Sequence, residues 1–400
     1  MAEPFEAVRI TDRVYWVGAI DWAIRDFHGY STERGTTYNA YLIKADKVTL
    51  VDTVKAGFMD QLMSRVRSVL DPEEIDIIVS NHAEMDHTGS LPAAIDVIRP
   101  SKVVASEMGV KALTEHFGLT GVEAVRDGEI LDLGGLEATF YETRMLHWPD
   151  SMFTYLADEE LLFSQDGFGM HLASTERFSD ELPDRVLDWE AAKYYANILL
   201  PYSPVVKKLL ARVGQLGLTP RHVCPDHGPV WRGETERIMS AYARWAEQSP
   251  TSKVVIVYDT MWGSTAKMAQ AVADGVASGG GSAKVIPLRA STRSDVATEV
   301  LDAGALVVGT PTLNNQVFPT LGDTLTYLKG LKPKNLIGAA FGSYGWSGEG
   351  AKHAHEMLRE MGVEMVQGRD EIVVSRYVPD DGVLRACREL GADIVERLLA

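Results

Sequence analysis

Residues 81–89, with the sequence NHAEMDHTG, concentrate side chain types that bind metal ions. Two imidazoles and two carboxylates fall within six positions, and they belong to His82, Glu84, Asp86 and His87. Three further candidates follow predicted strands later in the chain: His147, Asp166 and His227. Four imidazoles and three carboxylates form a donor set that suits non-haem iron or manganese better than a thiolate-loving metal.

The charge balance of these seven side chains favours two metal ions. Two divalent ions bring four positive charges, three carboxylates bring three negative charges, and one bridging hydroxide leaves the cluster about neutral. A neutral cluster avoids a large desolvation penalty when it is partly buried. A lone His or Asp would be explained as a surface or capping residue, but the pattern HxExDH at a strand end has few structural uses. The sequence therefore predicts a two-metal centre.

A second group of polar residues, TMWGST at positions 260–265, follows the predicted strand KVVIVYD and precedes a predicted helix. The hydroxyls of Thr260, Ser264 and Thr265, with backbone N–H groups near Gly263 and in the first helical turn, can bind a phosphate monoester. No lysine stands at the GK[ST] position, which excludes a triphosphate P-loop. Ordinary helix capping is the structural alternative for this segment.

Two later strand ends, TPTLNN at 310–315 and GSYGWSG at 342–348, should meet the same carboxyl edge of a parallel sheet. They offer backbone groups to a flavin ring, and Tyr344 or Trp346 offers an aromatic plane to stack on it. A single phosphate loop without GxGxxG favours FMN over FAD and NAD. The predicted FMN contacts are Thr260, Met261, Trp262, Gly263, Ser264, Thr265, Pro311, Thr312, Leu313, Asn314, Asn315, Ser343, Tyr344, Gly345, Trp346, Ser347 and Gly348.

The elements that must hold these two sites differ between the halves of the chain. Two strand-like runs flank a polar turn at 44–47 and predict an antiparallel hairpin, and short strands and helices follow. The sequence QSPTSK at 248–253 has the composition of a linker. Beyond it, five apolar strands alternate with helices, which predicts a doubly wound parallel sheet. We therefore expect an α/β protein with a metal domain at 1–249 and an FMN-binding domain at 253–400.

Composition narrows the class of partner. The 400 residues include 39 basic and 56 acidic ones, and the net charge of −17 repels nucleic acid and anionic membrane surfaces. The only cysteines, Cys224 and Cys387, lie far apart, so the chain holds neither a disulfide framework nor a four-cysteine iron site. No signal peptide or membrane-spanning stretch is evident, and a cytoplasmic location is expected.

The metal-binding pattern resembles the metallo-β-lactamase fold, whose loop reads HxHxDH, with Glu84 in place of the middle histidine. That replacement favours iron over zinc and is typical of the flavodiiron proteins. The ligand spacings are similar to those of this family, with 60, 19 and 61 positions separating His87, His147, Asp166 and His227. The resemblance covers nearly the entire chain from about Thr11 onward, and includes stretches such as RDFHGYS and FGSYGWSGE.

The resemblance implies an amino-terminal metallo-β-lactamase-like αββα sandwich followed by a flavodoxin-like domain. It also implies two non-haem irons joined by an oxo or hydroxo bridge. One iron would take His82, Glu84 and His147, and Asp166 would bridge to the other. The second iron would take Asp86, His87 and His227, although the histidine at the place of His87 varies as a direct ligand in this family. His28, His171 and Tyr195 would line the substrate pocket as proton donors.

The function implied by the resemblance is electron transfer through FMN to the diiron centre, with reduction of O₂ to water, of NO to N₂O, or both, for detoxification in an anaerobe. An external donor such as rubredoxin would supply electrons to a head-to-tail homodimer, or to a dimer of such dimers. Two alternatives stay open at this point: a zinc hydrolase of the metallo-β-lactamase fold with an accessory flavodoxin domain, and an electron carrier with a vestigial amino-terminal domain. The preference between O₂ and NO is also open.

Overall fold

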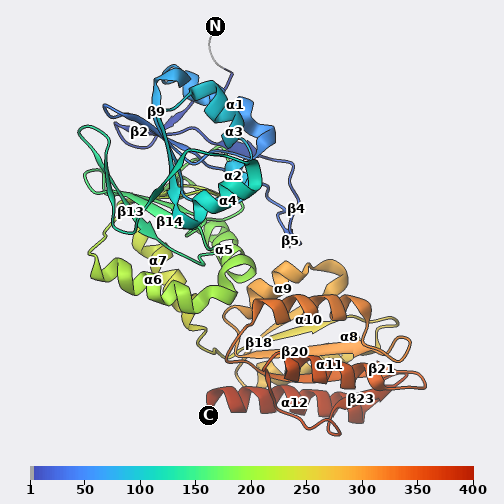
Figure 1. Ribbon diagram of the computed structural model, residues 1–400. Helices are drawn as coiled ribbons and strands as arrows, with labels where there is room; N and C mark the ends of the chain where they lie inside the picture. The colour runs from blue at the N-terminus through green and yellow to red at the C-terminus, as the bar shows by residue number, and fades with distance from the viewer. Residues whose placement is uncertain (1–3) are drawn as a thin grey trace. The chain divides into compact units, whose positions relative to one another are not determined.

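The computed structural model describes residues 4–400 of the chain (Figure 1). These residues form two compact units, which are described separately below. The first unit comprises the chain up to Tyr194 together with Pro204–Ala243, and the second comprises Tyr195–Ser203 together with Arg244–Ala400. The domain limits of 1–249 and 253–400 stay a prediction.

The first unit begins with a seven-stranded sheet in the order β1-β2-β7-β8-β9-β10-β11. Its first four strands pair antiparallel, and the hairpin predicted around residues 44–47 is confirmed as β7 and β8. From β8 onward the pairing is parallel. The strands are β1 (Val8–Arg9), β2 (Val14–Trp16), β7 (Tyr41–Ile43), β8 (Val48–Val51), β9 (Ile75–Ser80), β10 (Lys102–Ser106) and β11 (Val122–Val125).

A six-stranded sheet in the order β12-β13-β14-β15-β16-β17 forms the second layer of this unit. Its strands are β12 (Ile130–Asp132), β13 (Glu137–Glu142), β14 (Met152–Leu156), β15 (Leu161–Gln165), β16 (His222–Pro225) and β17 (Trp231–Arg232). Two small strand pairs lie outside both sheets: β3 (Ala19–Asp21) with β6 (Thr36–Tyr38), and β4 (Asp26–Phe27) with β5 (Tyr30–Ser31). The strand-like run predicted from Arg13 covers most of β3, whereas the short pair β4 and β5 was not predicted.

The two sheets of the first unit pack face to face, because one buried cluster contains side chains from both, such as Val79 of the first and Phe163 of the second. The outer face of the first sheet packs on α1 (Met59–Arg67), α3 (Leu91–Ile98) and α4 (Glu107–Phe117). Figure 1 shows α5 (Asp184–Tyr194), α6 (Ser203–Gln215) and α7 (Thr235–Glu247) on the side of the second sheet. The predicted αββα sandwich is confirmed.

The second unit contains a sheet in the order β19-β18-β20-β21, with β22 and β23 both pairing in parallel with β21. This order is the flavodoxin-like one, as predicted. The strands are β18 (Lys253–Tyr258), β19 (Ser282–Pro287), β20 (Ala305–Pro311), β21 (Ile337–Tyr344), β22 (Glu364–Met365) and β23 (Val373–Arg376). The helices are α8 (Ser264–Ser278), α9 (Arg293–Val300), α10 (Pro319–Leu331), α11 (Glu349–Glu360) and α12 (Asp381–Leu399).

Helices cover both faces of the second unit's sheet, which explains why its central strands β18, β20 and β21 are largely apolar rather than alternating. Side chains of α8 and α12 form one buried cluster with β18, β20 and β21. Figure 1 shows α9 and α10 on the side of the sheet away from α12. Among the described residues, no helix combines the length and the apolar character that crossing a membrane requires.

Candidate metal centre and flavin pocket

All seven predicted metal ligands converge in the first unit, and we call this set the ligand cluster. Each ligand follows a strand of one of the two sheets, so the sandwich brings four separate loops together. His82 lies two residues after β9, and Glu84 precedes the short helix α2 (Met85–Thr88), which carries Asp86 and His87. The remaining ligands follow the strands β13, β15 and β16, and they are His147, Asp166 and His227.

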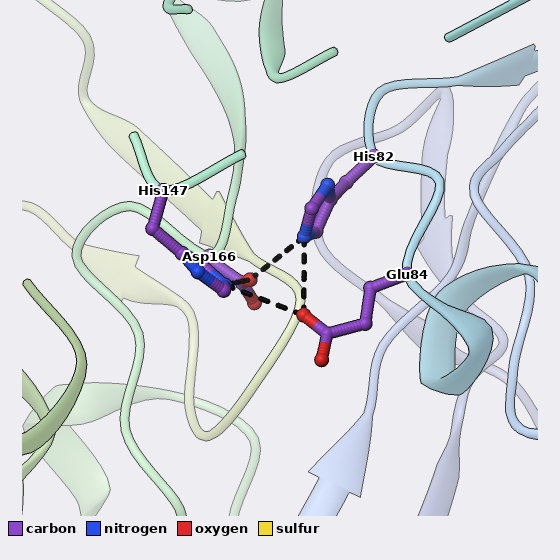
Figure 2. A group of neighbouring side chains, drawn as sticks. All are labelled: His82, Glu84, His147 and Asp166. Carbon is purple, nitrogen blue, oxygen red and sulfur yellow. Dashed lines mark hydrogen bonds and ion pairs between the residues drawn. The ribbon is translucent and has the colours of Figure 1, made fainter. Parts of the chain in front are cut away.

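The ligand cluster divides into two groups. Within each group, the donor atoms all lie within 4.8 Å of one another. The first group contains His82, Glu84, His147 and Asp166, whose side chains point toward a common centre (Figure 2). The second group contains Asp86, His87 and His227. The division matches the two ligand sets that the resemblance implies.

Asp166 reaches both groups through different oxygens. Its Oδ2 lies 2.8 Å from Nε2 of His147 and 3.3 Å from Nε2 of His82. Its Oδ1 lies 3.3 Å from Nε2 of His87 and 3.5 Å from Nε2 of His227. One carboxylate that faces two donor groups with its two oxygens is the arrangement that a bridging ligand requires.

Unsatisfied polar atoms inside the cluster fit a pair of bound cations. Both carboxylate oxygens of Asp86, both ring nitrogens of His87 and Oδ1 of Asp166 are buried without a hydrogen-bond partner among the described residues. Buried polar groups are normally satisfied, so such a concentration calls for a bound ion. The donors are imidazole nitrogens and carboxylate oxygens with no thiolate, which fits non-haem iron.

The electrostatics of the cluster point the same way. Burial lowers the pKa of the His87 imidazole, but the carboxylates of Asp86, Asp226 and Asp166 outweigh burial and raise this pKa to about 10. Burial likewise opposes protonation of His82, yet Asp150, Asp166 and Glu84 hold its pKa well above the usual range. The carboxylates therefore stabilise positive charge at the centre of the cluster. Metal ions would supply that charge and displace protons from these imidazoles on binding.

Outer partners, which the sequence patterns did not predict, fix the orientation of the ligand imidazoles. Nδ1 of His82 lies 3.0 Å from Oδ2 of Asp150, which also accepts a 2.6 Å hydrogen bond from the Ala83 N–H. Nδ1 of His227 lies 2.6 Å from the Thr37 carbonyl oxygen and donates to it, which leaves Nε2 free for a metal. Asp150 follows His147 by three residues, and this proximity to a ligand was the available signal.

We expect an Asp150→Ala variant to lose metal selectively from the group that contains His82. Removing an outer carboxylate typically weakens metal binding by about 10–100-fold. Metal analysis after dialysis against a chelator should therefore find about one iron fewer per chain than in the wild type. Asp150→Asn keeps an acceptor for the Ala83 N–H, and its iron content should lie between those of Asp150→Ala and the wild type. Retention of both irons by Asp150→Ala at the wild-type rate of release would show that Asp150 does not support His82.

The three predicted proton donors differ in where the structure places them. Nε2 of His28 lies 3.6 Å from Oε1 of Glu84, at the tip of the β4–β5 hairpin. His171 is buried, its Nδ1 lies 2.8 Å from Thr36 Oγ1, and its ring centroid is 4.6 Å from that of His227. Burial and the neighbouring His227 lower the pKa of His171 well below the usual range, so this imidazole is neutral at pH 7.

Tyr195 is not brought to the ligand cluster with the other two. Its hydroxyl lies 3.0 Å from Ser203 Oγ, and its ring packs on Trp245. Tyr194 lies there instead, with its ring centroid 5.1 Å from that of His171 and 6.1 Å from that of His227. The chain passes from α5 into a π-helical turn, η4 (Tyr195–Leu199), directly after Tyr194. A π-turn changes the direction of successive side chains, and the sequence pattern does not reveal it.

The flavin pocket is a cavity of about 720 Å³ in the second unit, at the carboxyl ends of β18, β20 and β21. It is lined by thirteen of the seventeen predicted contacts: Met261, Trp262, Ser264, Pro311, Thr312, Leu313, Asn314, Asn315, Ser343, Tyr344, Gly345, Trp346 and Ser347. Tyr377 and Val378 also line it and were not predicted. They follow β23, whose carboxyl end meets the same edge of the sheet, so the general rule for parallel sheets could have found them.

The four predicted contacts that do not line the flavin pocket have structural roles near it. Thr260 Oγ1 accepts a 3.1 Å hydrogen bond from the N–H of Gly263, whose φ of +87° is a left-handed conformation that favours glycine. Thr265 is buried, with its hydroxyl 2.9 Å from that of Ser343. Gly348 is the residue before α11. The cavity fits FMN for two reasons. Its apolar and aromatic walls suit the flavin ring, and the loop that leads into the N-terminus of α8 suits the phosphate.

Comparisons with known proteins agree with both sites. Residues 36–228 match the model of a family described as ODP family beta lactamase, and residues 256–391 match the flavodoxin model. The chain is similar to the rubredoxin-oxygen oxidoreductase of Megalodesulfovibrio gigas, with 47% identity over 90% of this chain and 91% of that protein. It is also similar to the nitric oxide reductase of Moorella thermoacetica, with 44% identity over the full length of both. The solved structure of the flavodiiron protein from Giardia intestinalis superposes with a TM-score of 0.95 at 31% identity, over 98% of this chain and 97% of that one.

Proposed function

Because the chain belongs to the flavodiiron protein family, we propose that it transfers electrons through FMN to a non-haem diiron centre and there reduces O₂ to water, NO to N₂O, or both. The observation that carries this proposal is the position of Asp166 between the two ligand groups. In an anaerobe this activity would remove O₂ and NO. The buried free thiols of Cys224 and Cys387 support a reducing compartment, and we propose a cytoplasmic location.

The protein side chains hold the cofactors and control protons. His82, Glu84 and His147 would hold one iron, Asp86, His87 and His227 the other, and Asp166 both. When bound, the irons and the flavin supply the electrons, four for O₂ going to two waters and two for two NO going to N₂O and water. Around them, the neutral His171 and the hydroxyl of Tyr194 offer hydrogen bonds to a small molecule, because burial and Asp166 raise the pKa of Tyr194 well above its usual range.

We expect Tyr194→Phe to slow gas reduction more than Tyr195→Phe does. Loss of one hydrogen bond to a charged group costs about 1.5–3 kcal/mol, which corresponds to a decrease in kcat of about 10–100-fold. Rates of O₂ and NO consumption by the two variants, at equal iron and FMN content, provide the measurement. A larger decrease in rate for Tyr195→Phe would support the role that the sequence pattern gave to Tyr195. It would contradict the role proposed for Tyr194.

We propose that the working molecule is a head-to-tail homodimer, in which one chain's flavin pocket meets the partner chain's ligand cluster. Exposed apolar side chains beside each site support this proposal. Trp262 and Trp346 at the flavin pocket are 94% and 88% exposed, and Met85, between two predicted ligands, is 56% exposed. Large exposed apolar side chains at one place are typical of an interaction surface.

A complementation experiment tests the dimer. One chain carries Asp166→Ala and retains its flavin pocket, while the other carries Ser264→Glu, which repels the flavin phosphate, and retains its ligand cluster. Neither variant alone should turn over. Mixed dimers should recover activity if electrons pass from one chain's flavin to the other chain's metals, and should stay inactive if both sites act within one chain.

The electron donor is proposed to be a separate protein, since the chain has only two cysteines and cannot carry its own rubredoxin-type iron site. Anaerobic assays with reduced rubredoxin, following O₂ and NO consumption, test both the donor and the activity. We expect consumption of at least one of the two gases. Absence of any gas consumption, together with zinc in place of iron, would instead favour the hydrolase alternative.

A further inference from the structure

A buried carboxylate, Asp259, stands directly before the predicted phosphate loop and does not line the flavin pocket. It lies at the carboxyl end of β18, where three connections between strands and helices come together. Its Oδ1 accepts hydrogen bonds from the N–H of Thr260 at 2.6 Å and from Nε of Arg289 at 2.9 Å. Its Oδ2 accepts a 2.7 Å hydrogen bond from the hydroxyl of Thr320.

Each of these partners belongs to a different connection. Thr260 begins the loop between β18 and α8, Arg289 lies in η6 (Leu288–Ala290) after β19, and Thr320 lies in the first turn of α10 after β20. The first of these loops provides Met261, Trp262 and Ser264 to the flavin pocket, and the third provides residues 311–315. One carboxylate therefore links two of the loops that line the flavin pocket.

The loop before α10 has an irregular backbone, which no strand or helix ladder holds in place. Asn314 and Asn315 have φ values of +51° and +61°, in the left-handed region. The hydroxyl of Thr310, at the start of this loop, accepts a 3.0 Å hydrogen bond from the N–H of Phe318, at its end. With Thr320 bound to Asp259, the loop is fixed at its end before any ligand binds, and a preformed site binds more tightly than one that must be ordered.

The charge of Asp259 is a difficulty for a phosphate site. The carboxylate is 2% exposed and is adjacent in sequence to a loop expected to bind a phosphate dianion. Its only ion pair among the described residues is with Arg289. Without that guanidinium, a buried negative charge would oppose the phosphate at short range, where solvent screens poorly.

We propose that Asp259 is a positioning residue for FMN and that Arg289 neutralises it. In this arrangement the hydrogen bonds of Asp259 set the spacing of the two loops, and the guanidinium removes the electrostatic penalty of using a carboxylate for that purpose. The inference rests on the proposed flavin function but concerns residues outside the flavin pocket itself.

A double-mutant cycle tests the coupling of the two residues. The full chain is freed of flavin, and the Kd for FMN is measured by quenching of flavin fluorescence in the wild type, Asp259→Asn, Arg289→Gln and the double variant. Arg289→Gln should weaken FMN binding about tenfold when Asp259 is present. The variant loses a charge-assisted hydrogen bond, and the negative charge of the carboxylate is then no longer neutralised. In the Asp259→Asn background the same change should cost less than about threefold.

Controls separate this role from a general loss of structure. Arg289→Lys keeps the charge and should restore most of the affinity. Arg293→Gln removes an arginine that pairs with an aspartate, Asp323, at 2.7 Å, and should leave the Kd within about twofold. Thermal unfolding of the flavin-free variants identifies any that fail to fold, and Thr320→Val then tests the loop link alone, with an expected weakening of about threefold or more.

Equal losses for Arg289→Gln in both backgrounds, or no loss in either, would overturn the inference. An unchanged Kd in Thr320→Val would overturn the part that concerns loop spacing. If the wild-type chain itself fails to bind FMN, the proposed function fails, which is distinguishable because the cycle presupposes wild-type binding.

Discussion

An Asp166→Ala variant is expected to bind neither iron tightly and to lose nearly all O₂ and NO reduction. Asp166 faces the first group through Oδ2 and the second through Oδ1, so its removal takes a ligand and a negative charge from both. Loss of outer partners alone weakens metal sites by about 10–100-fold, and a shared ligand should cost more than the upper end of that range. Turnover below about 1% of wild type is expected, with less than one iron per chain after dialysis.

The control for this prediction is Asp158→Ala, which removes an exposed aspartate from the turn of the same β14–β15 hairpin. It should keep two irons and full activity, and both variants should keep one FMN. Asp166→Ala with two irons and undiminished gas consumption would rule out the bridging role and, with it, the assignment of the ligand cluster as the reaction site.

A Glu84→His variant is expected to exchange iron for zinc. Oε2 of Glu84 lies 3.3 Å from Nε2 of both His82 and His147, so it contributes a negative charge at the centre of the first group. Replacing it with a neutral imidazole recreates the pattern HxHxDH, and a site with more imidazole and less carboxylate favours zinc. Zinc has no redox chemistry, and gas reduction should fall about a hundredfold or more while FMN content stays at one per chain.

The measurement is the ratio of zinc to iron in protein produced with both metals in the medium. Glu123→His serves as the control, because it adds a histidine on β11 in place of an exposed glutamate that pairs with Lys102. It should leave the ratio at the wild-type value. Retention of two irons and full activity by Glu84→His would show that Glu84 does not select the metal.

The architecture was predictable from sequence because its strongest signals are local. Five apolar strands alternating with helices identify a doubly wound sheet, and the order β19-β18-β20-β21 confirms it. The ligand cluster could be predicted from the sequence for a similar reason. Loops at strand ends carry the metal-binding types, and His82, Glu84, Asp86 and His87 fall within a single loop and the short helix after it.

Features that depend on the direction of one side chain, or on contacts between distant segments, could not be predicted from the sequence. Tyr194 and Tyr195 are neighbours of one type, and only the π-helical turn that begins at Tyr195 decides which of them lies beside His171. Asp150 supports His82 across 68 positions of sequence, and although its place three residues after His147 marked it as close to a ligand, that spacing did not show which imidazole it contacts. Asp259 is similar, because its three partners come from separate connections of the sheet.

The most direct test of the central claim is a single-turnover experiment without an external donor. The chain is loaded with two irons and one FMN, fully reduced under anaerobic conditions, and mixed with a limiting amount of O₂ or NO. The proposed function predicts that four stored electrons reduce one O₂ per chain to water, or convert NO to N₂O, with reoxidation of the flavin. Reduced protein that leaves both gases unconsumed, or that releases hydrogen peroxide as the main product from O₂, would contradict it.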